Sequence, residues 1–290
     1  MVGSSLEHKD KKELSRQIGM EVASICGEHF LNLEHLHYGY WTEDLQVSLA
    51  NLRAAQEKYA DFLISHIPAG VKSILDVGSG RGRMSKILLN AGYKVDCVSP
   101  SPLLAKQTRD LLGNGSYIFE CDYEDLKTQK RYDLILFSES FQYVQLEEAV
   151  RKTVGFLKDS GYLLICDFFK KDTEEKSLLS GGHPLEKFYK IVSKYPLKTV
   201  KDLDITEQTA PNIDIEHRIF EKVIHPVANR VEQLLSSRHP FLMKILKWKY
   251  RKKIDKLSDK YFSDKRTGES FKRFKSYRFL LYKKADAQNL

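Results

Sequence analysis

Short apolar runs alternate with helix-like segments through the middle of the chain. The runs are rich in Ile, Leu, Val, Tyr and Phe, and glycines or charged residues lie at their ends. They occupy 73–77, 94–98, 117–121, 132–137 and 162–169, and helical patterns fill 83–91, 101–112 and 145–157. Nearly continuous apolar strands that alternate with helices are typical of a parallel sheet covered by helices on both faces, with right-handed crossovers.

The chain on either side of this region has other patterns. Between 44 and 67, six large apolar side chains recur at helical spacing: Leu45, Leu49, Leu52, Tyr59, Phe62 and Leu63. After residue 170 we expect a sixth strand near 197–205, helices at about 213–236 and 240–262, and a last strand at 276–284. The pattern therefore predicts an α/β fold with a doubly wound, seven-stranded, mostly parallel sheet, N-terminal helices and a helical insertion before the last strand.

These elements predict four parts of the chain. They are an N-terminal helical cap over 1–67, an α/β core over 68–212, a helical insertion or lid over 213–270, and a terminal strand over 271–290 that completes the core sheet. The 290 residues suit one α/β domain of roughly 200 residues with appended segments. A hydrophobic content of 42% with 30% charged residues indicates a globular rather than a disordered chain.

The sequence gives weak signals on cellular location. No apolar run reaches the ~18 to 20 residues that a membrane span needs, and the first residues lack the apolar centre of a secretory signal. The four cysteines, Cys26, Cys97, Cys121 and Cys166, fit neither a C-x-x-C pair nor a zinc pattern. We interpret them as small buried side chains of a protein in the reducing cytoplasm.

The net charge of +8 is concentrated late in the chain. Residues 240–262 combine an apolar stripe at helical spacing with seven basic residues between 244 and 256. A basic amphipathic helix can rest on an anionic membrane, which would make the protein peripheral to that membrane. The alternative is a lid helix that packs its stripe on the core and solvates its lysines. The sequence leaves both interpretations open.

Three alternating glycines follow the first strand and precede a helix. In the run Asp76-Val77-Gly78-Ser79-Gly80-Arg81-Gly82 the spacing is G-x-G-x-G, which differs from the G-x-G-x-x-G of dinucleotide-binding folds. Glycine permits positive φ and lets a ligand approach the backbone closely. Because ligands of open α/β sheets bind at the carboxyl ends of the strands, we predict a ligand site at this loop.

The stretch I-L-D-V-G-S-G-R-G resembles motif I of the class I S-adenosylmethionine (SAM)-dependent methyltransferases, which have Rossmann-like folds. The resemblance covers residues 35–169. The segments H-L-H-Y-G-Y-W at 35–41 and V-S-P-S-P at 98–102 are similar to segments of the tocopherol, sterol and cyclopropane-synthase-like group. This resemblance implies a SAM cofactor, with S-adenosylhomocysteine as its product.

The resemblance also implies cofactor-binding roles for particular residues. Asp76 would hold the cofactor's ammonium beside Gly78, Ser79, Gly80 and Gly82. Ser99 and Ser101 would lie near the ribose, although most relatives have an acidic residue where Ser99 stands. Asp122 would accept the adenine amino group, with Tyr123 against the ring. Tyr38 or Tyr40 would meet the carboxylate, and the backbone at Ser138 would lie beside the methionine portion.

The catalytic chemistry is less determined. Glu139 and Tyr143 follow the fourth strand and are the candidates for facing the acceptor, and His37 and His183 are further candidates for a general base. Methyl transfer from a sulfonium mainly needs positioning and exclusion of water, so a base is required only when the acceptor carries a proton. The spacing of His35 and His37 does not suit a metal, and we predict no metal site.

These observations favour a SAM-dependent methyltransferase that acts on a small, apolar, aromatic or lipid-like acceptor by in-line transfer. One alternative is a nucleic-acid methyltransferase that uses the basic surface for phosphates. The segment after strand four reads F-S-E-S, however, and lacks the N/D-P-P-Y/F loop typical of such enzymes. The other alternative is a non-catalytic SAM-binding scaffold.

Overall fold

A seven-stranded sheet forms the centre of the molecule. The computed structural model describes residues 18–22, 24–173, 175, 177, 179–262 and 266–285. The strand order is β3-β2-β1-β4-β5-β7-β6; β1 to β5 pair in parallel, and β7 is antiparallel to both of its neighbours. The strands are β1 Ser73–Val77, β2 Lys94–Val98, β3 Ile118–Phe119, β4 Tyr132–Ser138, β5 Leu157–Lys170, β6 Leu197–Asp204 and β7 Lys275–Lys284. The predicted doubly wound, mostly parallel sheet is confirmed.

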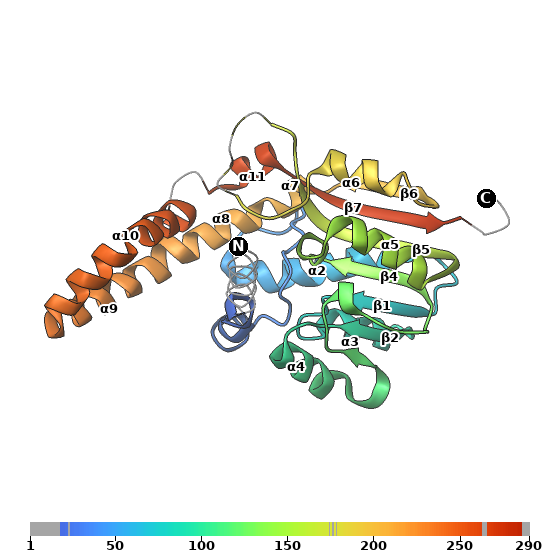
Figure 1. Cartoon of the computed structure of the whole chain (residues 1–290), viewed down its shortest axis with the longest axis horizontal. Helices are drawn as coiled ribbons and strands as arrows, with labels where there is room; N and C mark the ends of the chain where they lie inside the picture. The colour runs from blue at the N-terminus through green and yellow to red at the C-terminus, as the bar shows by residue number, and fades with distance from the viewer. Residues whose placement is uncertain are drawn as a thin grey trace, which may run out of the picture.

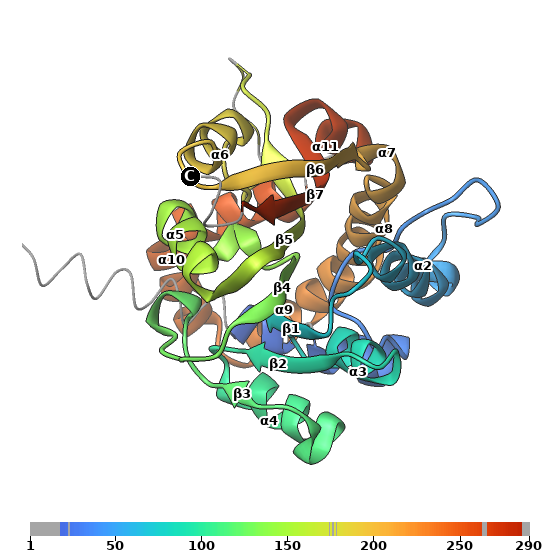
Figure 2. The same ribbon diagram turned by 90° about the vertical axis from the view of Figure 1, so that its right-hand side faces the viewer.

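Helices cover both faces of this sheet (Figure 2). Along β4, Leu134 and Leu136 point into one apolar cluster, while Ile135 and Phe137 point into the other. The first cluster packs against α2 Leu52–Ser65, α3 Arg83–Asn90 and α8 Pro211–Ile219, and the second against α5 Leu146–Phe156 and α6 Leu185–Val192. The remaining helices are α4 Pro102–Leu112, α7 Thr206–Thr209, α9 His225–Arg238, α10 Pro240–Phe262 and α11 Gly268–Phe274, and 24–31 are also helical.

Local signals set several element ends. The Ser101 hydroxyl caps α4 by accepting a hydrogen bond from the Leu104 amide at 3.2 Å, and Pro102 occupies the first helical position. The helix predicted from residue 44 begins later, because Ser48 caps a short 3-10 turn at Leu49–Asn51 that leads into α2. The third strand is also shorter than predicted, with only two paired residues.

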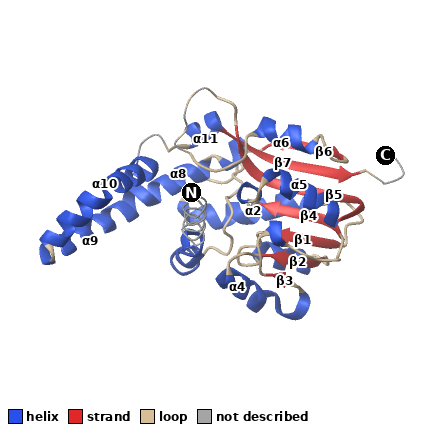
Figure 3. Ribbon diagram, viewed as in Figure 1, coloured by secondary structure: helices blue, strands red, loops and turns tan. Residues whose placement is uncertain are grey.

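Two helices project from the core as a hairpin (Figures 1 and 3). α8 continues through a π-helical segment at Phe220–Ile224 into α9, and α10 returns beside α9. No residue of α9 is buried, and Leu242 and Leu246 on the stripe of α10 remain 53% and 37% exposed. The described side chains of this stripe therefore do not pack on the core. Within the described residues, no helix has both the length and the apolarity to cross a membrane.

The cysteines differ from the sequence interpretation at two positions. Cys97 and Cys166 are buried in the core, Cys121 is partly buried and Cys26 is exposed on the N-terminal helical segment. All four are free thiols. Cys26 is exposed because it lies on the N-terminal helical segment and not in a strand of the buried sheet.

A buried asparagine joins the segment before the core to α8. The Asn212 carboxamide oxygen accepts hydrogen bonds from the Gly39 amide at 2.8 Å and the Trp41 indole at 3.2 Å. Its nitrogen donates to the Gly39 carbonyl at 2.8 Å and the Thr209 carbonyl at 2.7 Å. Asn212 is 3% exposed, so these four bonds satisfy groups that water cannot reach.

We expect Asn212→Ala to destabilise the protein by about 3 kcal/mol, since it leaves several buried polar groups without partners. Urea unfolding followed by circular dichroism measures the loss. Asn229→Ala, at an exposed position on α9, is the control and should change stability by no more than about 0.5 kcal/mol. Equal stability of the two variants would contradict the role given to Asn212.

Candidate functional site

The glycine loop joins the end of β1 to the start of α3. Gly78, Gly80 and Gly82 all have positive φ, at 77°, 56° and 81°. A Cβ at Gly78 would lie 2.4 Å from the Ser140 Cβ, and one at Gly82 would lie 2.8 Å from the Thr108 Cγ2. These two glycines are therefore required by packing. At Gly80 the nearest atom is the Leu36 Cδ1, at 3.2 Å, so Gly80 faces the segment across the cleft.

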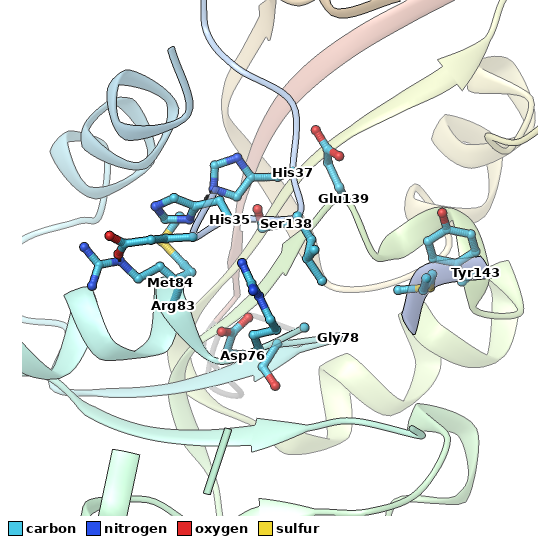
Figure 4. A pocket seen from close by; sticks show the side chains of 15 residues that line it. His35, His37, Asp76, Gly78, Arg83, Met84, Ser138, Glu139 and Tyr143 are labelled. Carbon is cyan, nitrogen blue, oxygen red and sulfur yellow. Dashed lines mark hydrogen bonds and ion pairs between the residues drawn. The ribbon is translucent and has the colours of Figure 1, made fainter. Parts of the chain in front are cut away.

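A cavity of about 160 Å³ lies over this loop (Figure 4). Its floor is the glycine loop, and the chain segment that carries His35, Leu36 and His37 crosses above it. The carboxyl ends of β1 and β4 supply the side chains on the remaining sides. Of the residues predicted from the sequence, the cavity brings together Asp76, Gly78, Ser79, Gly80, Ser138, Glu139 and Tyr143.

Asp76 is a buried carboxylate at the base of the cavity. It accepts a hydrogen bond from the Ser85 hydroxyl at the first turns of α3. Burial raises the pKa of Asp76 to about 6, and the bond from Ser85 opposes that shift. A cation bound beside this carboxylate would stabilise its charged form and lower the pKa again. The position thus suits a ligand with a positively charged group.

Glu139 has a strained backbone conformation directly after β4. Its φ is 55°, an uncommon value for a side chain other than glycine. One carboxylate oxygen accepts hydrogen bonds from the Tyr38 amide at 2.8 Å and the Tyr277 hydroxyl at 2.6 Å. Burial raises the pKa of Glu139 to about 8, although both hydrogen bonds act to lower it. The group can therefore gain or lose a proton close to neutral pH.

A chain of hydroxyl groups supports Glu139 from the core. The Tyr59 hydroxyl lies 3.1 Å from the Tyr277 hydroxyl and 3.3 Å from the Ser138 Oγ. Sequence reasoning missed Tyr59 and Tyr277, because they belong to α2 and β7 and carry no local motif. The sequence indicated only that Tyr59 belongs to the apolar face of a helix within 44–67 and that Tyr277 belongs to the last strand.

The two histidines above the cavity are neutral. His37 Nε2 lies 2.8 Å from His35 Nδ1, and His37 Nδ1 lies 2.8 Å from the Tyr38 carbonyl. Burial lowers the pKa of His35 to about 2 and that of His37 to about 4. Both nitrogens of His37 are engaged, so it is a poor general base. His183 lies away from the cavity, 3.0 Å from the Phe141 carbonyl, and burial lowers its pKa.

Two ion pairs connect the N-terminal segment, at Glu28 and Glu34, to the glycine loop and to α3. Arg81 of the loop lies 2.7 Å from Glu28, and Arg83 of α3 lies 2.8 Å from Glu34. Both arginines at this rim are thus paired with carboxylates. No group of three His, Cys, Asp or Glu side chains in the described parts of the chain has the arrangement of a metal site.

Several predicted cofactor residues lie outside the cavity. Tyr123 is a correction: its ring is buried in the second apolar cluster and its hydroxyl lies 2.9 Å from the Thr153 Oγ1, so it cannot form a wall for adenine. Ser101 caps α4 and donates to Glu21 at 2.8 Å. Tyr40 stacks on Phe62 with ring centroids 4.8 Å apart.

The remaining predicted cofactor residues, Ser99, Asp122 and Tyr38, lie on three different segments of the chain. Ser99 is buried at the end of β2, and Asp122 is exposed just after β3. Tyr38 contributes its amide to Glu139, while its ring lies among Phe168, Phe271 and Tyr277 with centroids 6.3 to 6.5 Å apart. The Tyr38 ring therefore faces an aromatic cluster beyond Glu139.

Comparisons with known proteins agree with this geometry. Residues 75–165 match the family described as methyltransferase domain, and this range includes the glycine loop, β4 and Glu139 directly after β4. Malonyl-[acyl-carrier protein] O-methyltransferase 2 of Ilyobacter polytropus is 29% identical over 213 residues, 69% of this chain and 78% of that protein. A malonyl-[acyl-carrier protein] O-methyltransferase of Acetivibrio thermocellus is 31% identical over 120 residues, 39% of this chain and 42% of that protein.

A solved structure shares the whole fold. Geranyl diphosphate C-methyltransferase of Streptomyces coelicolor superposes with a TM-score of 0.63 over 89% of this chain and 91% of that one, at 17% identity. At this identity the similarity concerns the fold alone. The matched family, the relatives and the glycine loop at the end of β1 together lead to one conclusion: this chain is a class I S-adenosylmethionine-dependent methyltransferase.

Proposed function

We propose that the enzyme methylates a small acceptor with an apolar, aromatic or lipid-like body, and that Glu139 removes the acceptor's proton. The observation that carries this proposal is the position of the Glu139 carboxylate. Glu139 lines the cavity together with Ser138 and the glycine loop, and burial brings its pKa to about 8. A base whose pKa is close to the working pH is the most effective in proton transfer.

The proposed cofactor pose follows the polar groups of the cavity. The SAM ammonium lies against Asp76, the buried carboxylate at the base of the cavity. The methionine portion passes over Gly78 and Gly80, and a side chain at residue 80 would project into the cleft toward Leu36. The nucleoside extends toward the ends of β2 and β3, which leaves Ser99 and Asp122 as candidates for ribose and adenine. Ser101 and Tyr123 are no longer among them.

The proposed acceptor site lies at the cavity beside Tyr143 and borders the aromatic cluster on the far side of Glu139. Tyr38, Phe168, Phe271 and Tyr277 lie within ring contact of one another, and Tyr143 stands at the cavity with 42% of its surface exposed. Aromatic faces suit an apolar or aromatic acceptor better than a charged one. We therefore keep Tyr143 as a residue that contacts the acceptor rather than as a base.

The proposed reaction is an in-line displacement at the methyl carbon. As the acceptor's oxygen, nitrogen or carbon bonds to the methyl group, the carbon–sulfur bond breaks and its electron pair returns to sulfur, which leaves as the thioether S-adenosylhomocysteine. Glu139 takes the acceptor's proton. The protein's own contribution is to align the two reactants and exclude water under the 35–37 segment.

The relatives named above offer a second acceptor chemistry, the carboxylate of a carrier-bound malonyl group. A carboxylate is already ionised, so its methylation requires no base. Loss of Glu139 would then have little effect on rate, whereas a hydroxyl, amine or carbon acceptor would depend on it. Incubating the protein with a metabolite extract and labelled SAM, followed by mass analysis, identifies the acceptor, and failure of any small molecule to gain label would contradict the proposal.

The pH dependence of kcat tests the state of Glu139. The deprotonated carboxylate is the active form, so kcat should fall as the pH drops through about 8. Tyr277→Phe removes a hydrogen bond that favours the charged carboxylate, so it should move this midpoint to higher pH. A rate that is independent of pH between 6 and 9 in the wild-type protein would contradict the assignment.

A further inference from the structure

The α9–α10 hairpin is the one large described feature that the proposed reaction does not use. It extends from α8 away from the sheet, and its tip, around His239, lies at the far end of the molecule (Figures 1 and 3). A projecting hairpin exposes both helices to solvent and costs stability unless something covers its apolar side chains. The side chains near its tip indicate what that partner is.

The first three turns of α10 carry an exposed apolar patch. Phe241, Ile245 and Trp248 are spaced at i, i+4 and i+7, so they share one face of the helix. Phe241 is 77% exposed, Ile245 is 44% exposed and Trp248 is 81% exposed. At 100° per residue this face lies roughly 130° around the helix from the stripe of Leu242, Leu246 and Tyr250. We call Phe241, Ile245 and Trp248 the tip patch.

Basic side chains surround the tip patch. α10 contains eight lysines and arginines against two aspartates, and α9 contains two arginines against one glutamate, so the hairpin accounts for most of the chain's net charge of +8. Lys249 and Lys252 are exposed on the same side of the helix as the tip patch, and Lys244 is exposed between Phe241 and Trp248. The surface is thus both apolar and strongly positive.

The apolar and positively charged character of this surface favours one class of partner over the others. A second copy of the chain would bring an equally positive hairpin, and repulsion would oppose the contact. A nucleic-acid duplex would pair with the lysines but leave Phe241 and Trp248 in water, because its bases are stacked inside the duplex. An anionic lipid bilayer satisfies both: indole and phenyl rings insert at the headgroup level, and lysines contact the lipid phosphates.

We propose that the hairpin docks on anionic lipid membranes, with the tip patch inserted and the surrounding lysines on the headgroups. The hairpin lies outside the cofactor cavity, so this proposal holds for any acceptor and stands apart from the proposed reaction. A membrane-docked enzyme would meet apolar acceptors where they are concentrated, at the bilayer surface.

Tryptophan fluorescence of the full chain gives a direct test. The chain has two tryptophans, Trp41 at 5% exposure and Trp248 at 81%, so only Trp248 starts in water. Vesicles of phosphatidylcholine with phosphatidylglycerol should shift the emission to the blue, and vesicles of phosphatidylcholine alone should not. Trp248→Phe should abolish the shift, because the buried Trp41 remains. No shift with anionic vesicles would overturn the proposal.

Vesicle sedimentation separates the charge from the apolar contribution. Lys249→Glu/Lys252→Glu should weaken binding by about 10- to 30-fold, at ~1 kcal/mol per basic residue lost, and Phe241→Ser/Trp248→Ser should weaken it at least as much. The control Lys187→Glu/Lys190→Glu makes the same charge change on exposed α6 positions and should bind as the wild type does. Equal loss in the control, or binding of RNA or self-association through the hairpin without vesicle binding, would overturn the proposal. SAM affinity should be unchanged in all hairpin variants.

Discussion

Glutamine in place of Glu139 is expected to lower kcat by about 10²- to 10³-fold, while the Kd for SAM changes by no more than about twofold. Glutamine keeps the size of the side chain and can still accept from the Tyr38 amide and the Tyr277 hydroxyl, so the strained turn at residue 139 should persist. What it loses is the ability to take a proton. Single-turnover rates with the identified acceptor, together with calorimetric SAM binding, measure the two quantities separately.

Glu186→Gln is the matched control, because Glu186 is an exposed carboxylate on α6 outside the cavity. It should leave both the rate and SAM binding at wild-type values. If Glu139→Gln keeps the wild-type rate with an acceptor that must lose a proton, Glu139 is not the base. If it keeps the rate with a carboxylate acceptor, the chemistry of the malonyl-carrier relatives applies here instead.

Valine in place of Gly80 is expected to weaken SAM binding by more than about 100-fold. Gly80 has φ 56°, which valine tolerates poorly, and its side chain would project toward Leu36 across the cleft. Either effect removes the close approach of the ligand to the main chain that we propose. Isothermal calorimetry with SAM and with S-adenosylhomocysteine measures the loss.

Gly92→Val separates backbone strain from obstruction of the cleft. Gly92 has φ 93° and no atom within 4 Å of an added Cβ, so its variant carries strain without blocking any site. It should lose some stability and keep SAM affinity. Circular dichroism of both variants establishes that they are folded. A Gly80→Val protein that is folded and binds SAM as the wild type does would show that the cofactor does not lie against residue 80.

The strands and the glycine loop could be predicted because their signals are local. Short apolar runs define β1, β2 and β4, and the G-x-G-x-G spacing after Asp76 indicates a ligand loop. The spacing alone could not assign separate roles to the three glycines. Ser140 and Thr108, which require glycine at 78 and 82, come from other elements and meet the loop only in the folded chain.

The positions that the sequence could not place, Tyr123, Tyr277 and the stripe of α10, all depend on contacts between distant parts of the chain. Tyr123 occupies a position next to Asp122 where either a ligand or the core could receive its ring, and contact with Thr153 and Phe137 decides for the core. Tyr277 contacts Glu139 from a strand 138 positions later, and no motif connects them. The stripe of α10 fits a lid and a projecting hairpin equally well, because helical periodicity does not reveal what a helix faces.

A crystal structure of the protein with S-adenosylhomocysteine tests the central claim most directly. We predict that the homocysteine portion lies over Gly78 and Gly80, with its ammonium within hydrogen-bonding distance of the Asp76 carboxylate and its sulfur near Ser138 and Glu139. The compound bound elsewhere, with the cavity under His35 and His37 left empty, would contradict the account.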